Sequence, residues 1–158
     1  MTEHFASFNG HQVAFEPGQT ILQVAKANDI FIPTLCAYLA LNHTPGTCRM
    51  CLVEVFEGDN PEGRVVTACT TPIREGQRIF TRNERVRKMQ QLQMELLFAD
   101  HDQDCKSCSR HGDCELQDVS LFIGMKHWPR HKSFIAERPY DDSSAGIIRD
   151  VNKCIRCG

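Results

Sequence analysis

Nine cysteines, most of them close together in the chain, restrict the fold of this sequence more than any other feature. With one histidine they form two sets of four and a final pair: Cys36, Cys48, Cys51 and Cys69; His101, Cys105, Cys108 and Cys114; Cys154 and Cys157. The odd count argues against a complete disulfide framework, and the first residues lack the basic region and apolar stretch of a secretory signal. In a reducing compartment, grouped cysteines usually bind metals or take part in redox chemistry. The sequence therefore predicts two four-ligand metal sites.

Composition and charge exclude several classes of function. The chain has 158 residues, enough for one domain or two small ones, and its net charge is −2. This charge gives no sign of a nucleic-acid or anionic-membrane partner. No apolar run approaches the roughly 20 residues that cross a bilayer. There is also no glycine-rich phosphate loop, no G-x-S-x-G and no H-E-x-x-H. We expect a cytoplasmic protein with no membrane insertion and no catalytic residues of its own.

The first half of the chain carries the signals of a small mixed sheet with a helix across one face. Asn9-Gly10 lies between two alternating runs and predicts a β-hairpin. Thr20 can cap a helix over residues 21–29, whose apolar side chains would face the hairpin. Further strands are expected over residues 51–56, 64–70 and 77–81.

After Asn83 the apolar residues recur at helical spacing. Asn83 is a suitable N-cap for a helix that continues to residue 100, with these apolar positions: Val86, Met89, Leu92, Leu96 and Leu97. A second amphipathic helix is expected over residues 114–124, ending at Gly124. Residues 126–147 are polar and predict a connection, in which Trp128 is expected to serve as a packing anchor.

The first set of cysteines has the spacing C-x11-C-x2-C-x17-C. Four thiolates can bind either zinc or an iron–sulfur cluster. A zinc ribbon usually has two close pairs, whereas a lone early cysteine, one tight pair and a distant fourth are typical of a [2Fe–2S] site. Gly46 would allow backbone N–H groups to turn toward the cluster sulfurs. The spacing favours a [2Fe–2S] cluster and leaves zinc as an alternative.

The second set has the spacing H-x3-C-x2-C-x5-C. Three cysteines and one histidine form a common structural zinc site, but they can also bind a [4Fe–4S] cluster. A neutral imidazole in place of a thiolate would leave such a cluster less negative and would raise its reduction potential. His111 lies in the same stretch and is an alternative ligand. From spacing alone, both metals remain open here.

The sequence also resembles one known family in five motifs that occur in order: "IPTLC", "GTCRMCLVEV", "TACTTP", "DHDQDCKSCSRHGDCELQ" and "VNKCIRCG". They are similar to the N-terminal iron–sulfur region of the large iron–sulfur subunit of complex I. Relatives of that subunit occur in NAD(P)-linked [FeFe]-hydrogenases and NAD-dependent formate dehydrogenases. The resemblance implies an α+β chain in three parts. A β-grasp, ferredoxin-like domain would cover residues 1–82, a small helical domain 83–125, and a connection to a further ferredoxin domain 126–158.

The same resemblance implies the ligands and the function. Cys36, Cys48, Cys51 and Cys69 would bind a [2Fe–2S] cluster, and His101, Cys105, Cys108 and Cys114 a [4Fe–4S] cluster. Cys154 and Cys157 would begin a further [4Fe–4S] motif that stops at Gly158, so we expect a piece of a longer subunit. The expected function is electron transfer between a flavin-containing NAD(P)H-oxidising subunit and a hydrogenase or formate dehydrogenase centre. The alternatives are a zinc-stabilised interaction domain and a fragment of a complex I subunit.

Overall fold

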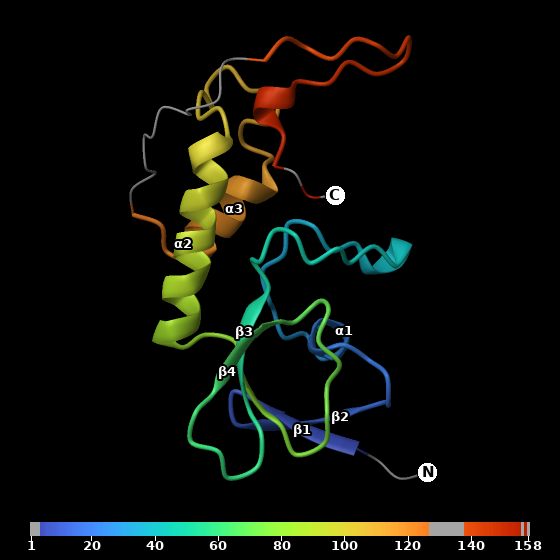
Figure 1. Ribbon diagram of the computed structural model, residues 1–158, viewed down its shortest axis with the longest axis vertical. Coiled ribbons are helices and arrows are strands. Elements are labelled where there is room, and N and C mark those ends of the chain that lie inside the picture. The colour runs from blue at the N-terminus through green and yellow to red at the C-terminus, as the bar shows by residue number, and fades with distance from the viewer. Residues whose placement is uncertain (1–3, 127–137, 156, 158) are drawn as a thin grey trace.

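The computed structural model describes residues 4–126, 138–155 and 157 (Figure 1). The expectation for Trp128, and much of that for the connection around it, lies outside these residues. Five strands form one sheet in the order β2-β1-β5-β3-β4, with bounds β1 His4–Phe8, β2 His11–Phe15, β3 Leu52–Phe56, β4 Arg64–Thr67 and β5 Arg78–Phe80. The first and last strands of the domain, β1 and β5, lie side by side and parallel. With the antiparallel pairs on either side, this is the β-grasp arrangement that the resemblance implied.

The expected hairpin and its helix are both present. Asn9 and Gly10 join β1 to β2 with positive φ angles of 50° and 93°, as a two-residue hairpin turn requires. Helix α1 spans Ile21–Ala27, and the Thr20 side chain accepts a hydrogen bond from the Gln23 backbone in a full capping box. The helix ends two residues before the predicted limit because Asp29 takes a positive φ.

The strand expected over residues 64–70 is shorter than predicted. β4 ends at Thr67, because the N–H groups of Thr70 and Thr71 donate back to the Thr67 carbonyl and turn the chain. Cys69 therefore lies in a turn and not at the end of a strand. The turn carries Cys69 toward the loop that precedes β3, since the Ala68 N–H donates to the Cys51 carbonyl at 2.9 Å.

Helix α2 spans Glu84–Asp100, and its N-cap is the predicted one. The Asn83 side chain accepts from the Val86 N–H, while its amide donates to the buried Glu54 on β3. Arg85 adds an ion pair to Glu54 at 2.7 Å. A buried carboxylate with two such donors joins the start of α2 to the sheet, so the direction of the helix is set from β3.

The buried face of α2 differs from the one that the apolar spacing indicated. The helix buries Val86, Gln90, Met94 and Phe98, which recur every four residues. Met89, Leu92 and Leu96 are instead between 40% and 59% exposed. The amphipathic pattern is weak because the polar Gln90 occupies a buried position while three apolar residues lie outside.

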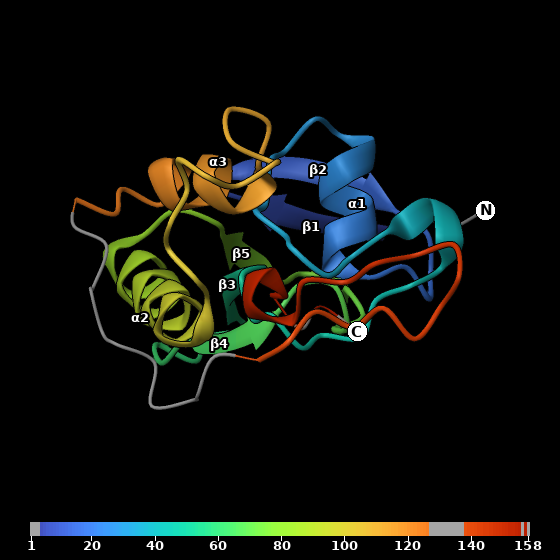
Figure 2. The same ribbon diagram turned by 90° about the horizontal axis from the view of Figure 1, so that it is seen from above.

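Helix α3 spans Glu115–Phe122 and ends before Gly124, which has a positive φ, as predicted. Two short 3-10 turns complete the described elements: η1 at Leu39–Leu41 and η2 at Val151–Lys153. Figure 2 shows α2 and α3 at one end of the sheet, with η2 beside them. None of the described helices is long and apolar enough to cross a membrane.

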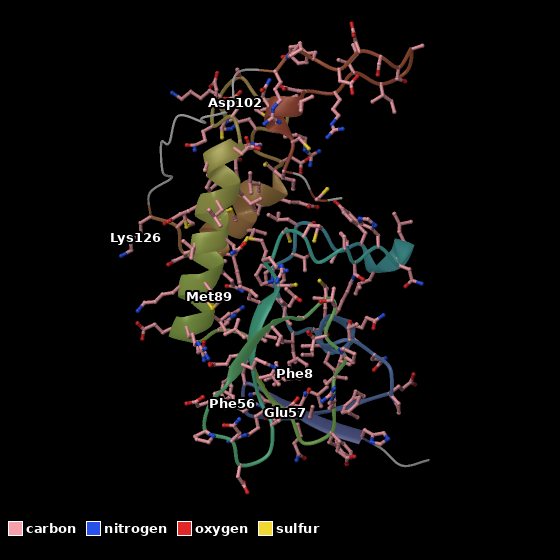
Figure 3. The ribbon with its side chains drawn as sticks, viewed as in Figure 1. Phe8, Phe56, Glu57, Met89, Asp102 and Lys126 are labelled. Atoms are coloured by element: carbon pink, nitrogen blue, oxygen red, sulfur yellow. The ribbon has the colours of Figure 1, made fainter. Side chains whose placement is uncertain are left out.

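The buried side chains form two cores. The first fills the space between α1 and the sheet and includes Phe8, which Figure 3 marks within the strand layer. The second lies between α2, α3 and the loop before β3, and contains Met50, Met94 and Phe98. The first core includes Cys51 and Cys69 and the second includes Cys36 and Cys48, so the whole first ligand set lies inside the packed parts of the molecule.

Candidate metal centres

The first set of cysteines comes from three separate loops. Cys36 follows α1, Cys48 and Cys51 precede β3, and Cys69 lies in the turn after β4. All four are buried, with at most 4% of any residue exposed. Four cysteines that span 33 positions of the chain thus place their side chains in one region away from solvent, as the sequence predicted.

The four thiols are neighbours in a row. Cys36 and Cys48 form a side-chain hydrogen bond, Cys51 and Cys69 form another, and Cys48 interacts electrostatically with Cys51. Burial raises the pKa of Cys48 to about 11. The hydrogen bond to Cys69 raises the pKa of Cys51 above its usual range, and the same bond lowers the pKa of Cys69. Four adjacent buried thiolates would repel one another, so the site can lose its protons fully only when positive charge enters it.

The backbone around these thiols supplies hydrogen-bond donors. The Met50 N–H donates to the Cys48 sulfur at 3.5 Å, and the backbone of Gly46 stabilises the Cys69 thiolate. Gly46 and Arg49 both have positive φ, at 67° and 55°. A Cβ at Gly46 would also come within 3.0 Å of the Thr70 methyl group, so this turn favours glycine. Buried thiols cradled by N–H groups fit a [2Fe–2S] cluster, whose sulfurs accept such bonds.

The second set of ligands lies where α2 ends and α3 begins. His101 is the C-cap of α2, Cys105 and Cys108 lie in the following loop, and Cys114 is the N-cap of α3. All four line one cavity, which Phe98 and Leu116 close from the second core. A loop between two packed helices thus brings the predicted histidine and cysteines together.

The imidazole of His101 is available to a metal. Its Nδ1 atom is buried and, among the described residues, has no hydrogen-bond partner. Burial lowers the pKa of His101, and the nearby Lys153 lowers it further, while the neighbouring aspartates act in the opposite direction. The neutral form binds metals, so both the orphaned nitrogen and the lowered pKa fit a ligand role. His111 lines the same cavity, but its side chain is exposed.

Neither set has the geometry of a site for one ion. Among residues 4–126, 138–155 and 157, no three histidine, cysteine, aspartate or glutamate side chains converge as a single metal ion would require. A tetrahedral zinc site needs four donors around one point, whereas a cluster spreads its ligands over several iron atoms. Four cysteines, or three cysteines with a histidine, are donor sets that can bind iron–sulfur clusters.

The last pair, Cys154 and Cys157, lies next to the first set. The Thr47 hydroxyl donates to the Cys157 carbonyl at 3.2 Å, and Cys157 packs against the core that contains Cys48. Cys48 and Cys154 line a shared cavity of about 210 Å³. The Arg149 guanidinium donates to the Cys154 sulfur at 3.2 Å.

Two polar residues that the sequence did not single out hold these loops in place. Gln90 on α2 is 2% exposed, and its amide donates to the carbonyls of Met50 and Leu52, on either side of Cys51. Lys153 on η2 pairs with Asp102, beside His101, at 2.7 Å. The only signal for Gln90 was its place in the four-residue register of α2, and for Lys153 its position before Cys154.

Comparisons with known proteins match most of the chain. Residues 6–84 match the family model of a 2Fe-2S iron-sulfur cluster binding domain. Residues 90–129 match the NADH-ubiquinone oxidoreductase-G iron-sulfur binding region. The first range includes all four cysteines of the first set, and the second includes His101 and the three cysteines that follow it. The chain therefore carries a [2Fe–2S]-binding domain and a [4Fe–4S]-binding region.

Several relatives cover nearly all of this chain with only part of their own length. The NADP-reducing hydrogenase subunit HndD of Solidesulfovibrio fructosivorans is 36% identical over 96% of this chain and 26% of its own. The NADH-ubiquinone oxidoreductase 75 kDa subunit of Reclinomonas americana is 33% identical over 94% and 21%. The NADPH-Fe(3+) oxidoreductase subunit alpha of Geobacter sulfurreducens is 32% identical over 96% and 17%. The chain thus spans about a quarter or less of these relatives.

A solved structure has the same fold. A chain of an NAD+-reducing [NiFe]-hydrogenase in the H2-reduced state superposes with a TM-score of 0.86 at 30% identity. The match covers 98% of this chain and 63% of the hydrogenase chain.

Proposed function

This chain belongs to the family of 2Fe-2S iron-sulfur cluster binding domains, extended by the NADH-ubiquinone oxidoreductase-G iron-sulfur binding region, and from that premise we propose that it relays electrons within an NAD(P)-linked oxidoreductase. The observation that carries the proposal is the link between the buried first ligand set and the half-buried second set through one core. Cys36 and Cys48 of the first set and Cys114 of the second all contact the core between α2 and α3. Two redox sites that share a packed core are held at a fixed separation, as a relay needs.

The ligands follow from the two sets. Cys36, Cys48, Cys51 and Cys69 bind the [2Fe–2S] cluster, and His101, Cys105, Cys108 and Cys114 bind the [4Fe–4S] cluster. When bound, each cluster accepts and releases one electron at a time. Cys154 and Cys157 begin a further [4Fe–4S] motif, and the contact of Cys157 with Thr47 supports a place for it beside the first cluster.

The chain's own residues tune this chemistry. Burial of the first set excludes water, and the backbone N–H groups near Gly46 and Met50 stabilise negative charge on the sulfurs. His101 contributes no charge to the second set, because its lowered pKa keeps the imidazole neutral. The N–H donors at the first set and the neutral imidazole at the second each raise the reduction potential relative to a four-thiolate site without them, whereas burial of the first set acts in the opposite direction. The part that we propose for the chain is to position and tune the clusters.

The partners we propose are a flavin-containing subunit that oxidises NAD(P)H and a hydrogenase or formate dehydrogenase centre, in the cytoplasm. Support comes from the relatives, whose names describe an NADP-reducing hydrogenase subunit and an NADPH-Fe(3+) oxidoreductase subunit. A complex I role is the second candidate, and the 33% identity to a 75 kDa subunit favours it. Both assign the same relay to this chain and differ only in the electron acceptor.

Metal analysis of the anaerobically purified chain tests the proposal. We expect about six irons and six sulfides per chain, with two distinct EPR signals on reduction by dithionite. Cys51→Ser should alter only the [2Fe–2S] signal, and Cys108→Ser only the [4Fe–4S] signal. About two irons and one zinc per chain would instead make the second set a structural zinc site and would remove it from the relay.

A further inference from the structure

We propose that Lys153 sets the reduction potential of the [4Fe–4S] cluster through its positive charge, an inference that depends on the ligand assignment above. One-electron reduction makes the cluster and its thiolates more negative by one charge, and no bond is made or broken. A fixed cation nearby stabilises the reduced form more than the oxidised form. The inference concerns a residue outside both ligand sets and outside both matched ranges, 6–84 and 90–129.

Lys153 is anchored to the loop that holds the histidine. Its ammonium lies 2.7 Å from a carboxylate oxygen of Asp102 and 3.1 Å from the Asp104 carbonyl. Asp102 directly follows His101, and Figure 3 shows it at the upper end of α2, beside the C-terminal segment. The same ammonium interacts electrostatically with His101 and with the Cys108 sulfur. Two of the four proposed ligands therefore lie within its field.

The backbone keeps this lysine in place. The Asp102 N–H donates to the Asn152 carbonyl at 3.0 Å, and the Asp150 side chain caps the turn η2 that carries Lys153. A second ion pair, between Arg138 and Asp100 at 3.1 Å, joins the end of α2 to the C-terminal segment, where the Asn152 side chain donates to the Arg138 carbonyl. The Lys153 side chain is only 20% exposed, so solvent screens its charge less than that of a surface lysine.

The carboxylate of Asp102, 2.7 Å from the Lys153 ammonium, stabilises the charged form of this lysine despite its partial burial. Asp100 is the last residue of α2, Asp102 and Asp104 lie on the loop that follows, and Asp102 lines the cavity. Loss of the lysine would remove a positive charge and would also take its 2.7 Å ion-pair partner from the Asp102 carboxylate. Both effects would disfavour the reduced form of the cluster.

The test is an EPR-monitored redox titration of the cluster-loaded chain. Lys153→Met removes the charge at similar length, and Lys153→Arg keeps the charge. Lys88→Met is the matched control, since Lys88 pairs with Glu84 in the first turn of α2, about 20 Å along the helix from His101. For Lys153→Met we expect the equilibrium constant for reducing the [4Fe–4S] cluster to fall about tenfold, a lowering of about 59 mV. The [2Fe–2S] potential, Lys153→Arg and Lys88→Met should stay near the wild type.

Each outcome bears on one proposal. A wild-type chain without a [4Fe–4S] signal would overturn the proposed function. A wild-type signal with no shift in Lys153→Met would overturn this inference alone, and so would an equal shift of both clusters. If Lys153→Met loses the cluster, Asp102→Asn decides, because it removes a negative charge from the same place. A raised [4Fe–4S] potential in that variant supports the electrostatic role, and an unchanged one overturns it.

Discussion

His101 is the residue on which the character of the second site depends. Its Nδ1 atom is buried without a partner among the described residues, and its pKa is lowered by burial, so the neutral ring can take up a metal. We expect His101→Cys to keep the cluster and to lower its reduction potential, because a fourth thiolate adds one negative charge. The potential is measured by redox titration, with iron content as the check on occupancy.

His111→Ala provides the control for this substitution. His111 lines the same cavity from its exposed side, and its loss should leave the potential unchanged. An unaltered potential in His101→Cys would remove His101 from the ligands. A shift in the His111 variant would assign that role to His111.

Cys69 gives the first site a distinct pH dependence before a cluster enters. The hydrogen bond from Cys51 lowers the pKa of Cys69 to about 7, while burial raises that of Cys48 to about 11. In cluster-free protein we therefore expect one thiolate of this set to form as the pH rises through about 7. Its absorbance near 240 nm should vanish in Cys69→Ser. In Cys51→Ala the midpoint should rise, because the main cause of the lowered pKa is gone. A midpoint that stays near 7 in Cys51→Ala would contradict this explanation.

At the residue scale the sequence identified the thiols and the histidine but not the polar groups that hold them. Cysteines at metal-binding spacings stand out in any sequence, and both sets do lie together. The sequence gives no comparable signal for Gln90 and Lys153, since glutamine and lysine are common on helix surfaces. Their roles depend on partners 38 to 51 positions away in the chain, which spacing alone does not reveal.

Helix α2 is the element that joins the two sites. Gln90 points to the carbonyls beside Cys51, and the next residue, Gln91, donates to the carbonyls of Ile123 and Gly124 at the end of α3. We expect Gln90→Leu to lower the free energy of unfolding by about 1–3 kcal/mol, because two buried carbonyls lose their donor. It should also broaden or shift the EPR signal of the [2Fe–2S] cluster. Both effects are measured on one preparation, by urea unfolding and by EPR.

Gln91→Leu is the matched variant one residue along the helix. It removes the same amide but acts on α3, so any spectral change should appear in the [4Fe–4S] signal. If both variants perturb the same cluster, the assignment of Gln90 to the [2Fe–2S] site and of Gln91 to the [4Fe–4S] site is wrong.

The elements themselves were predictable where local rules decide them. The hairpin at Asn9-Gly10, the capped helix after Thr20 and the end of α3 before Gly124 each depend on a turn or cap within a few residues. The buried face of α2 was not, because it is fixed by what β3 and α3 place against the helix. β4 is shorter than predicted for a similar reason. The N–H groups of Thr70 and Thr71 donate to the Thr67 carbonyl, and the resulting turn places Cys69 near Cys51.

At the scale of the whole molecule, the two cores divide the structural roles. The core under the sheet contains Cys51 and Cys69 among many aliphatic side chains, including Ile21, Val53 and Ile79. The core between α2 and α3 is smaller and includes Cys36, Cys48 and, at its edge, Cys114. Candidate cluster ligands therefore make up a larger share of the second core.

Removal of both clusters should accordingly loosen the molecule unevenly. Binding energy at a metal site contributes to folding, and a small core that loses it opens first. We expect hydrogen exchange in the cluster-free chain to stay slow at β1, β3 and α1, and to become fast at residues 101–114 and in α3. The amides of α2 near Val86 should remain protected, because Glu54 and Asn83 fasten that end to the sheet. Reloading iron and sulfide should restore the slow exchange. Uniform loss of protection across both cores would show that the clusters hold the sheet as well, and that the two parts do not fold separately.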